Sequence, residues 1–203
     1  IKALAEAEGV INLAGEPIAE RRWTPTHCKE LQNSRLYTTR GLVNAMAQLR
    51  RPPGVLINAS AIGYYGTSQD ARFTEESPCG KDFLASLCEQ WETIATTKPR
   101  STRLIIFRIG IVLGQGVGAL GKMLPVFKAG LGGPIGTGDQ WMSWVHRSDL
   151  CKMIQQSLTQ KSWSGVVNAV APEAVSMSKF TTLLGKRLGR PSLLPVPGAL
   201  LKL

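Results

Sequence analysis

Four short apolar runs, separated by longer amphipathic stretches, organise the chain. They lie near 10–14, 55–60, 104–109 and 166–170. The run that begins at Val55 is nearly continuous and follows the turn-forming Pro52-Pro53-Gly54, which is typical of a strand buried on both faces of a parallel sheet. We therefore expect these four segments to be parallel strands of one sheet.

Apolar residues at helical spacing fill the stretches between these runs. The pattern predicts helices near 27–48, 82–97, 122–129, 148–159 and 176–187, and a short strand at 141–145. Thr24 or Thr26 can cap the first of these helices, whereas Ser176 can cap the last and Gly189 can end it. Because strands alternate with helices of crossover length, the sequence predicts an α/β fold with helices on both faces of a parallel sheet.

Small residues and hydroxyls follow the second strand. Ala59-Ser60-Ala61 lets a flat ligand approach the backbone, and Tyr64 and Tyr65 lie just beyond, between two glycines. Open α/β sheets bind ligands in the crevice at the carboxyl ends of their strands. A ligand site and an ordinary core strand followed by a turn both remain possible interpretations of this stretch.

The chain is basic, with a formal charge of +10 over 203 residues. An acidic partner such as nucleic acid would explain this charge, but the basic residues are scattered in pairs such as Arg21-Arg22 and Arg50-Arg51. A cleft for a phosphate-bearing ligand explains the charge equally well. We therefore expect no nucleic-acid partner.

Four cysteines and two histidines show no metal-ligand spacing. There is no C-x-x-C pair, and His27 and His146 are far apart in sequence. We expect no metal, no disulfide framework and a reducing compartment. No apolar run reaches membrane-spanning length, so we expect no membrane partner. Because the first residue is Ile1, we expect the chain to begin inside a longer protein.

Several motifs in a fixed order resemble one family. They are Val10-Ile-Asn-Leu-Ala-Gly-Glu16, Arg22-Trp-Thr24, Ser34-Arg35, Asn58-Ala-Ser-Ala-Ile-Gly-Tyr-Tyr-Gly66, Thr74-Glu-Glu-Ser-Pro78, Trp91-Glu92, Arg108-Ile-Gly-Ile-Val-Leu-Gly114, Gly130-Leu-Gly-Gly-Pro-Ile-Gly136 and Trp144-Val-His-Arg-Ser-Asp-Leu150. Together they resemble the epimerase-like branch of the extended short-chain dehydrogenase/reductase superfamily. That branch is often called a SulA homolog or cell-division inhibitor, and has cyanobacterial and chloroplast members.

This resemblance implies a Rossmann-like, doubly wound parallel sheet that binds NADP(H), with a small C-terminal substrate lobe. We expect residues 1–171 to form the nucleotide-binding domain, with 116–140 contributing to the lobe, and 172–203 to complete the lobe. The family's first strand and its glycine-rich turn, which holds the pyrophosphate at a helix start, do not occur in the sequence. We expect that N-terminal portion to be missing here.

The resemblance also implies which residues border the cofactor. Leu13, Ala14 and Gly15 end the first strand, and Ala59 and Ser60 end the second, where small or apolar residues suit an adenosine or ribose. Gly110 and Val112 correspond to a turn beside the nicotinamide carboxamide. Glu30 and Arg35 are placed near the nucleotide, where Arg35 can donate to phosphate or ribose oxygens; the alternative is a solvated pair of charges.

The superfamily's proton-transfer residues are altered. Ser60 matches its active-site hydroxyl, but the positions of its Tyr-x-x-x-Lys pair hold Leu84 and Cys88, neither of which can do that chemistry. Tyr64 or Tyr65 is a hypothetical substitute, and Cys88 either faces the nicotinamide or is a small core residue. We interpret His146 as structural and Asp149 as a helix cap or a first-turn acid.

Two functions remain open. The first is an NADP(H)-dependent oxidoreductase or epimerase-like enzyme acting on a small-molecule or nucleotide-linked substrate. The second is a catalytically silent nucleotide sensor or scaffold, linked to cell division and acting through a homodimer or a protein partner. The expected compartment is the cytoplasm, or the chloroplast stroma for a plastid protein.

Overall fold

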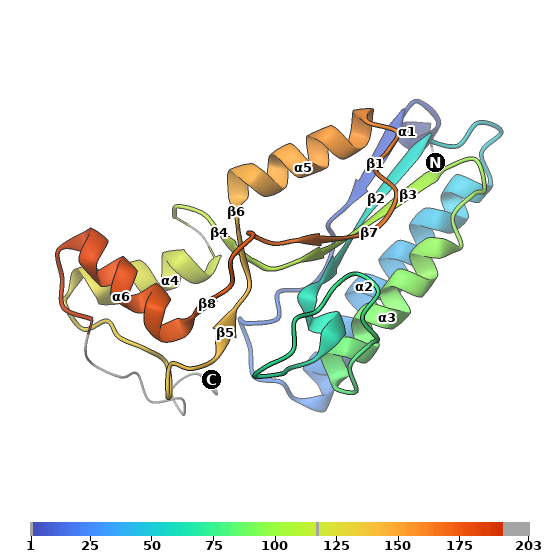
Figure 1. Ribbon diagram of the computed structural model, residues 1–203. Helices are drawn as coiled ribbons and strands as arrows, with labels where there is room; N and C mark the ends of the chain where they lie inside the picture. Colours follow the sequence, from blue (N-terminus) through green and yellow to red (C-terminus); the bar gives the residue numbers. More distant parts are fainter. Residues whose placement is uncertain (1, 117, 193–203) are drawn as a thin grey trace. The chain divides into compact units, whose positions relative to one another are not determined.

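The computed structural model describes residues 2–116 and 118–192 (Figure 1). The chain divides into two compact units. The first comprises Ile1–Ile109 and Cys151–Ala169, and the second comprises Gly110–Leu150 and Val170–Leu203. That the second unit binds substrate stays a prediction. No helix among the described residues is both long and apolar enough to cross a membrane.

A four-stranded parallel sheet forms the centre of the first unit. Its strands are β1 (Gly9–Asn12), β2 (Val55–Ala61), β3 (Arg103–Ile109) and β7 (Gly165–Ala169), in the order β1-β2-β3-β7. All three pairings are parallel, which confirms the four predicted strands. The first six residues of β2 are buried, because its apolar run lies between two neighbouring strands and under helices.

Two long helices lie side by side on one face of this sheet (Figure 1), α2 (Pro25–Ala47) and α3 (Phe83–Thr96). Thr24 caps α2 by accepting a hydrogen bond from the backbone N–H of His27, as predicted. Asp82 caps α3 in the same way, through Ala85. The core between these helices and the sheet includes the buried residues Val43, Met46, Leu56 and Ile94.

The Cys151–Thr159 part of helix α5 (Arg147–Thr159) lies on the opposite face of this sheet (Figure 1). Arg103 at the start of β3 donates to the carbonyls of Ser157, Leu158 and Trp163. Carbonyls at the end of a helix lack intrahelical partners, so one guanidinium here satisfies the end of α5 and ties it to the sheet. Two short elements complete this unit, α1 (Lys2–Ala5) and the 3-10 helix η1 (Ile62–Tyr65).

The described residues of the second unit form short strands and two complete helices. They are β4 (Ile111–Leu113), α4 (Gly118–Lys128), β5 (Trp141–Met142), β6 (Trp144–His146), β8 (Val175–Ser176) and α6 (Met177–Leu188). The predicted strand 141–145 is divided at Ser143, whose carbonyl accepts a hydrogen bond from Ile111. Strand β5 pairs with β8, and β6 pairs with β4. Ser176 caps α6, and Gly189 ends it with φ of 62°, as predicted.

Candidate functional site

Buried hydrogen bonds link the carboxyl end of β1 to the middle of β2. Asn12 is the register partner of Asn58, and its side-chain amide donates to Asn58 Oδ1 at 2.7 Å and to Thr39 Oγ1 at 2.9 Å. Trp91 Nε1 donates to the same Thr39 hydroxyl at 2.7 Å. Thr39 and Asn58 are fully buried, so these bonds are the means by which their polar groups are satisfied. These hydrogen bonds hold α2 and α3 against β1 and β2.

The three residues that we predicted to border a cofactor at the end of the first strand lie directly after β1. Asn12 Oδ1 accepts a hydrogen bond from the backbone N–H of Ala14 at 3.3 Å. Leu13, Ala14 and Gly15 are all exposed, and 55% of Leu13 is accessible. An exposed leucine beside two small residues at a parallel sheet's carboxyl edge leaves room for a flat ligand such as a nucleoside.

Arg35 holds the backbone of this turn. Its guanidinium donates to the carbonyl of Glu16 at 3.0 Å and to that of Leu31 at 3.1 Å, and it lies 5.4 Å from the centre of the Trp91 ring. A Cβ added at Gly15 would come within 2.9 Å of Arg35 Cζ. Burial lowers the pKa of this guanidinium from its ordinary value. Arg35, which we predicted to donate to phosphate or ribose oxygens, therefore already donates to two main-chain carbonyl oxygens.

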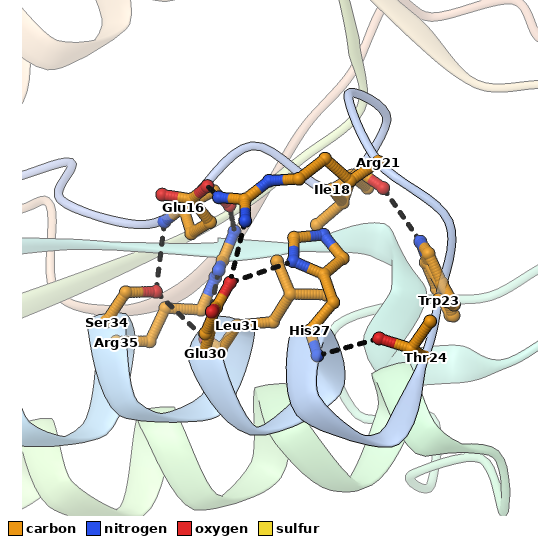
Figure 2. A network of polar contacts seen from close by, with 10 residues as sticks. All are labelled: Glu16, Ile18, Arg21, Trp23, Thr24, His27, Glu30, Leu31, Ser34 and Arg35. Carbon is orange, nitrogen blue, oxygen red and sulfur yellow. Dashed lines mark hydrogen bonds and ion pairs between the residues drawn. The ribbon is translucent and has the colours of Figure 1, made fainter. Parts of the chain in front are cut away.

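Glu30 lies in an ion-pair network that joins the start of α2 to the loop after β1 (Figure 2). Arg21 binds both Glu30 and Glu16, and Glu30 also faces His27 Nδ1 at 3.3 Å. Glu30 and Arg35 do not pair with each other, and a role of either residue at the nucleotide stays a prediction. Five positions along a helix place two side chains on different faces.

The three groups Glu16, His27 and Glu30 could in principle hold a metal ion. Their ligand atoms lie within 4.8 Å of one another. However, the Arg21 guanidinium already binds both carboxylates (Figure 2). His27 is buried, and its Nε2 has no hydrogen-bond partner among the described residues, whereas a metal-bound histidine normally donates from its second nitrogen. We assign this cluster to ion pairing.

A buried ion pair under the end of β2 was not predicted as part of the site. Arg108 Nε and Nη2 each bind one carboxylate oxygen of Glu92 at 2.9 Å. The two side chains are only 4% and 9% exposed. Although burial lowers the pKa of Arg108, the hydrogen bonds that it donates to Glu92 and Tyr65 raise the pKa overall. Arg108 and Glu92 both belong to motifs of the sequence, but no local sequence pattern shows that their side chains contact each other.

Ser60 belongs to this buried network. Its hydroxyl donates to Glu92 Oε1 at 2.6 Å and is almost fully buried. Ser60 is also the register partner of Arg108 on the adjacent strand, which places all three groups together. Ala59, its neighbour on β2, is also buried.

The paired tyrosines contact the same guanidinium in different ways. The Tyr65 hydroxyl accepts from Arg108 Nη1 at 3.0 Å and donates to Asn168 Oδ1 at 2.6 Å. The Tyr64 ring lies over Arg108, with the guanidinium carbon 3.4 Å from the ring centre, and it meets the Tyr65 ring edge-on. Asn168, whose backbone N–H donates to Glu75 at 2.8 Å, was also missed.

Cys88 faces Ser60 from α3. Burial raises the pKa of its thiol, while hydrogen bonding with the Ser60 side chain and the Ala61 backbone opposes that rise. Leu84, one turn earlier, packs 3.4 Å from the position a Cβ would take at Gly63. Position 88, which we aligned with the superfamily's lysine, therefore lies beside Ser60.

The remaining predicted residues belong to the second unit. Gly110 packs so closely that a Cβ would lie 2.7 Å from the Ser143 carbonyl, and Val112 pairs with Val145 in the β4–β6 ladder. His146 is exposed, with Nδ1 2.7 Å from the Ser148 hydroxyl. Asp149 lies in the first turn of α5, as interpreted.

Comparison with known proteins identifies the class. Residues 1–169 match the NAD dependent epimerase/dehydratase family, and the chain belongs to this family. It is 46% identical, over 95% of its length, to the chloroplastic SDR39U1 homolog of Arabidopsis thaliana, of which it covers 56%. It is 40% identical, over 98% of its length, to the human epimerase family protein SDR39U1, of which it covers 69%.

A solved structure supports the same assignment. The chain resembles the crystal structure of human SDR39U1 (isoform 2) with NADPH, with a TM-score of 0.93 and 38% identity over 98% of this chain and 70% of that one. The expected Rossmann-like α/β fold is thereby confirmed.

Proposed function

We propose that this protein binds NADP(H) and acts as an atypical extended short-chain dehydrogenase/reductase, oxidising, reducing or epimerising a small-molecule or nucleotide-linked substrate. The observation that carries the proposal is the close structural similarity to a relative solved with NADPH. We further propose that the glycine-rich pyrophosphate turn lies in the part of the relatives' length that this chain does not cover.

The geometry of the first unit supports this proposal. Leu13–Gly15 and Ala59–Ser60 follow or end adjacent parallel strands, so they lie at the same edge of the sheet. We propose that these two segments border the nucleotide. That Gly110 and Val112 also contact it stays a prediction. Arg35 supports the β1 turn by its bonds to Glu16 and Leu31. A bound nicotinamide would supply hydride-transfer chemistry.

A second candidate function rests on Leu84 and Cys88. Neither side chain replaces the superfamily's tyrosine and lysine, which favours a nucleotide sensor that acts through a second copy or a partner protein without turnover. A reducing compartment, either the cytoplasm or the chloroplast stroma, is proposed for both functions. The four cysteines are unpaired.

Calorimetry with full-length protein tests the first part of this proposal. We expect NADPH to bind at least about tenfold more tightly than NADH, a difference of about 1.4 kcal/mol. Equal dissociation constants would contradict the NADP(H) assignment.

Turnover separates the two functions. NADPH oxidation is followed with a panel of aldehydes and ketones that includes 4-nitrobenzaldehyde, and NADP⁺ reduction with a panel of alcohols and sugar nucleotides. Turnover with any of them supports the enzyme. Tight NADPH binding together with silence across both panels supports the sensor.

A further inference from the structure

The direction of each hydroxyl proton beneath the end of β2 follows from the buried ion pair. An ionised carboxylate only accepts hydrogen bonds, and a guanidinium only donates them. Ser60 therefore gives its single proton to Glu92 across 2.6 Å. Its oxygen can offer lone pairs to a ligand but no proton. Ser60 can accept a hydrogen bond from a substrate hydroxyl, but it cannot protonate a substrate oxygen without breaking its bond to Glu92.

Tyr65 is committed in the same manner. Its oxygen accepts from Arg108 Nη1, so its proton is directed to Asn168 Oδ1 at 2.6 Å. Tyr65 is 7% exposed, and its ring stacks on that of Phe73 with the ring centres 5.1 Å apart. Tyr65 would have to give up its hydrogen bond to Asn168 to donate its proton to a substrate, which makes it a supporting residue.

Tyr64 differs from both. Its hydroxyl makes no hydrogen bond to any of the described residues, and its side chain is partly exposed. The face of its ring contacts the Arg108 guanidinium at 3.4 Å from the ring centre. That cation is fixed in place by two bonds to Glu92. Tyr64 thus has an uncommitted proton and a fixed positive charge against its ring.

We propose that Tyr64 is the proton-transfer residue of this site, with Arg108 supporting the phenolate in place of the superfamily's lysine. The proposal deepens the proposed oxidoreductase function and rests on it. As hydride from the reduced nicotinamide reaches a carbonyl carbon, the carbonyl π electrons move onto oxygen. That oxygen takes the Tyr64 proton, the substrate becomes an alcohol, and solvent reprotonates the phenolate.

The groups around Tyr64 suit a donor that stays protonated at neutral pH. Burial raises the pKa of its phenol, Arg108 lowers it, and Cys79, Glu92 and Glu89 raise it. The net direction is upward, so the proton is present before reaction. A cation pressed against the ring then stabilises the phenolate as it forms.

The experiment uses full-length protein labelled with ¹³C at tyrosine Cζ, whose chemical shift reports ionisation of each phenol. Tyr64→Phe assigns the Tyr64 signal, and Tyr37→Phe is the control, because Tyr37 is 68% exposed on α2. Titrations are run without cofactor, with NADPH and with NADP⁺. The oxidised nicotinamide carries a positive charge, so we expect the Tyr64 titration midpoint to be about one unit lower with NADP⁺ than with NADPH. The Tyr37 midpoint should not move.

A kinetic measurement completes the test. With 4-nitrobenzaldehyde as the probe, Tyr64→Phe should lower kcat by about 10²-fold or more, as for loss of a general acid, and leave NADPH affinity unchanged. A Tyr64 midpoint that is the same with both cofactors, or a Tyr64→Phe variant with full turnover, would overturn the proposal while NADPH binding stands. Failure of NADPH to bind would instead refute the proposed function itself, and this inference with it.

Discussion

Arg108 and Glu92 form a two-point ion pair beneath the end of β2, with both nitrogen–oxygen distances at 2.9 Å. The pair is nearly inaccessible to solvent. Its geometry is the parallel fork that gives guanidinium–carboxylate bonds their strength and direction. Ser60, Tyr64 and Tyr65 all contact this pair, and its hydrogen bonds direct the hydroxyl protons of Ser60 and Tyr65.

Replacing Glu92 with glutamine should destabilise the protein strongly. An unpaired buried guanidinium remains, and breaking a buried pair from one side typically costs about 3–5 kcal/mol. The free energy of unfolding, measured in urea, checks this value. Glu89→Gln is the matched control, because Glu89 is exposed on the same helix. Equal stability of the two variants would contradict a structural role for the pair.

Removing the Thr39 hydroxyl should affect two donors at once. Thr39→Val keeps the shape of the side chain but leaves Asn12 Nδ2 and Trp91 Nε1 without their shared acceptor. Asn12 retains Asn58, so Trp91 loses more. We expect about 2–4 kcal/mol less stability, since each unsatisfied buried donor costs about 1–3 kcal/mol. Thr38→Val, at an exposed neighbouring position, should change stability little in the same urea titration.

Arg35→Ala should weaken NADPH binding and also loosen the turn after β1. The guanidinium bonds the Glu16 and Leu31 carbonyls, so its loss frees the turn that we propose borders the nucleotide. Gly15→Ala is the complementary change, because its methyl would displace the guanidinium. Calorimetry should show lower affinity for both variants, and proteolysis within residues 13–24 should be faster. Unchanged NADPH affinity in both variants would show that this turn does not border the cofactor.

The thiol of Cys88 should make stability fall at alkaline pH. Burial raises its pKa above the ordinary value of 9.0, so the folded state holds the proton more tightly than the unfolded state. The resulting stabilisation is complete below pH 9 and is lost as pH rises through the folded-state pKa. Urea titrations between pH 7.5 and 10.5 should therefore decline less steeply for Cys88→Ala than for the wild type. Parallel curves would contradict this, and Cys151→Ala, at an exposed thiol, serves as the control.

Much of the fold was predictable because its signals are local. Apolar runs mark the four strands, and Thr24 and Ser176 are side chains that cap the helices that follow them. The division of the strand at Ser143 depends on a hydrogen bond from Ile111, more than thirty residues away in sequence. No local pattern contains that information.

The candidate site was predictable only in part. Small residues at the strand ends mark Ala14 and Ser60, but Glu92 lies 32 residues from Ser60 and 16 from Arg108. The polarity of these residues gave no sign that they are buried together. The parallel register of Ser60 with Arg108 brings them into contact, and register depends on the whole sheet.

Cys88→Lys tests whether position 88 can regain the superfamily's cation. The new ammonium would be buried beside Ser60, near Glu92, which already binds Arg108, and near Arg35, which would repel it. Burying such a charge costs several kcal/mol, so the melting temperature should fall well below that of Cys88→Met, a control of similar length without charge.

NADPH should restore part of this loss, because ligand at 100 times its dissociation constant stabilises the folded state by about 2.7 kcal/mol. The ribose hydroxyls would give the ammonium acceptors that the free protein lacks, so NADPH should raise the melting temperature of Cys88→Lys more than that of Cys88→Met. Adding Leu84→Tyr then provides a phenol one helical turn away, on the side of η1. An equal NADPH response in the lysine and methionine variants would show that position 88 does not face the nicotinamide ribose, and that its cysteine is a core residue.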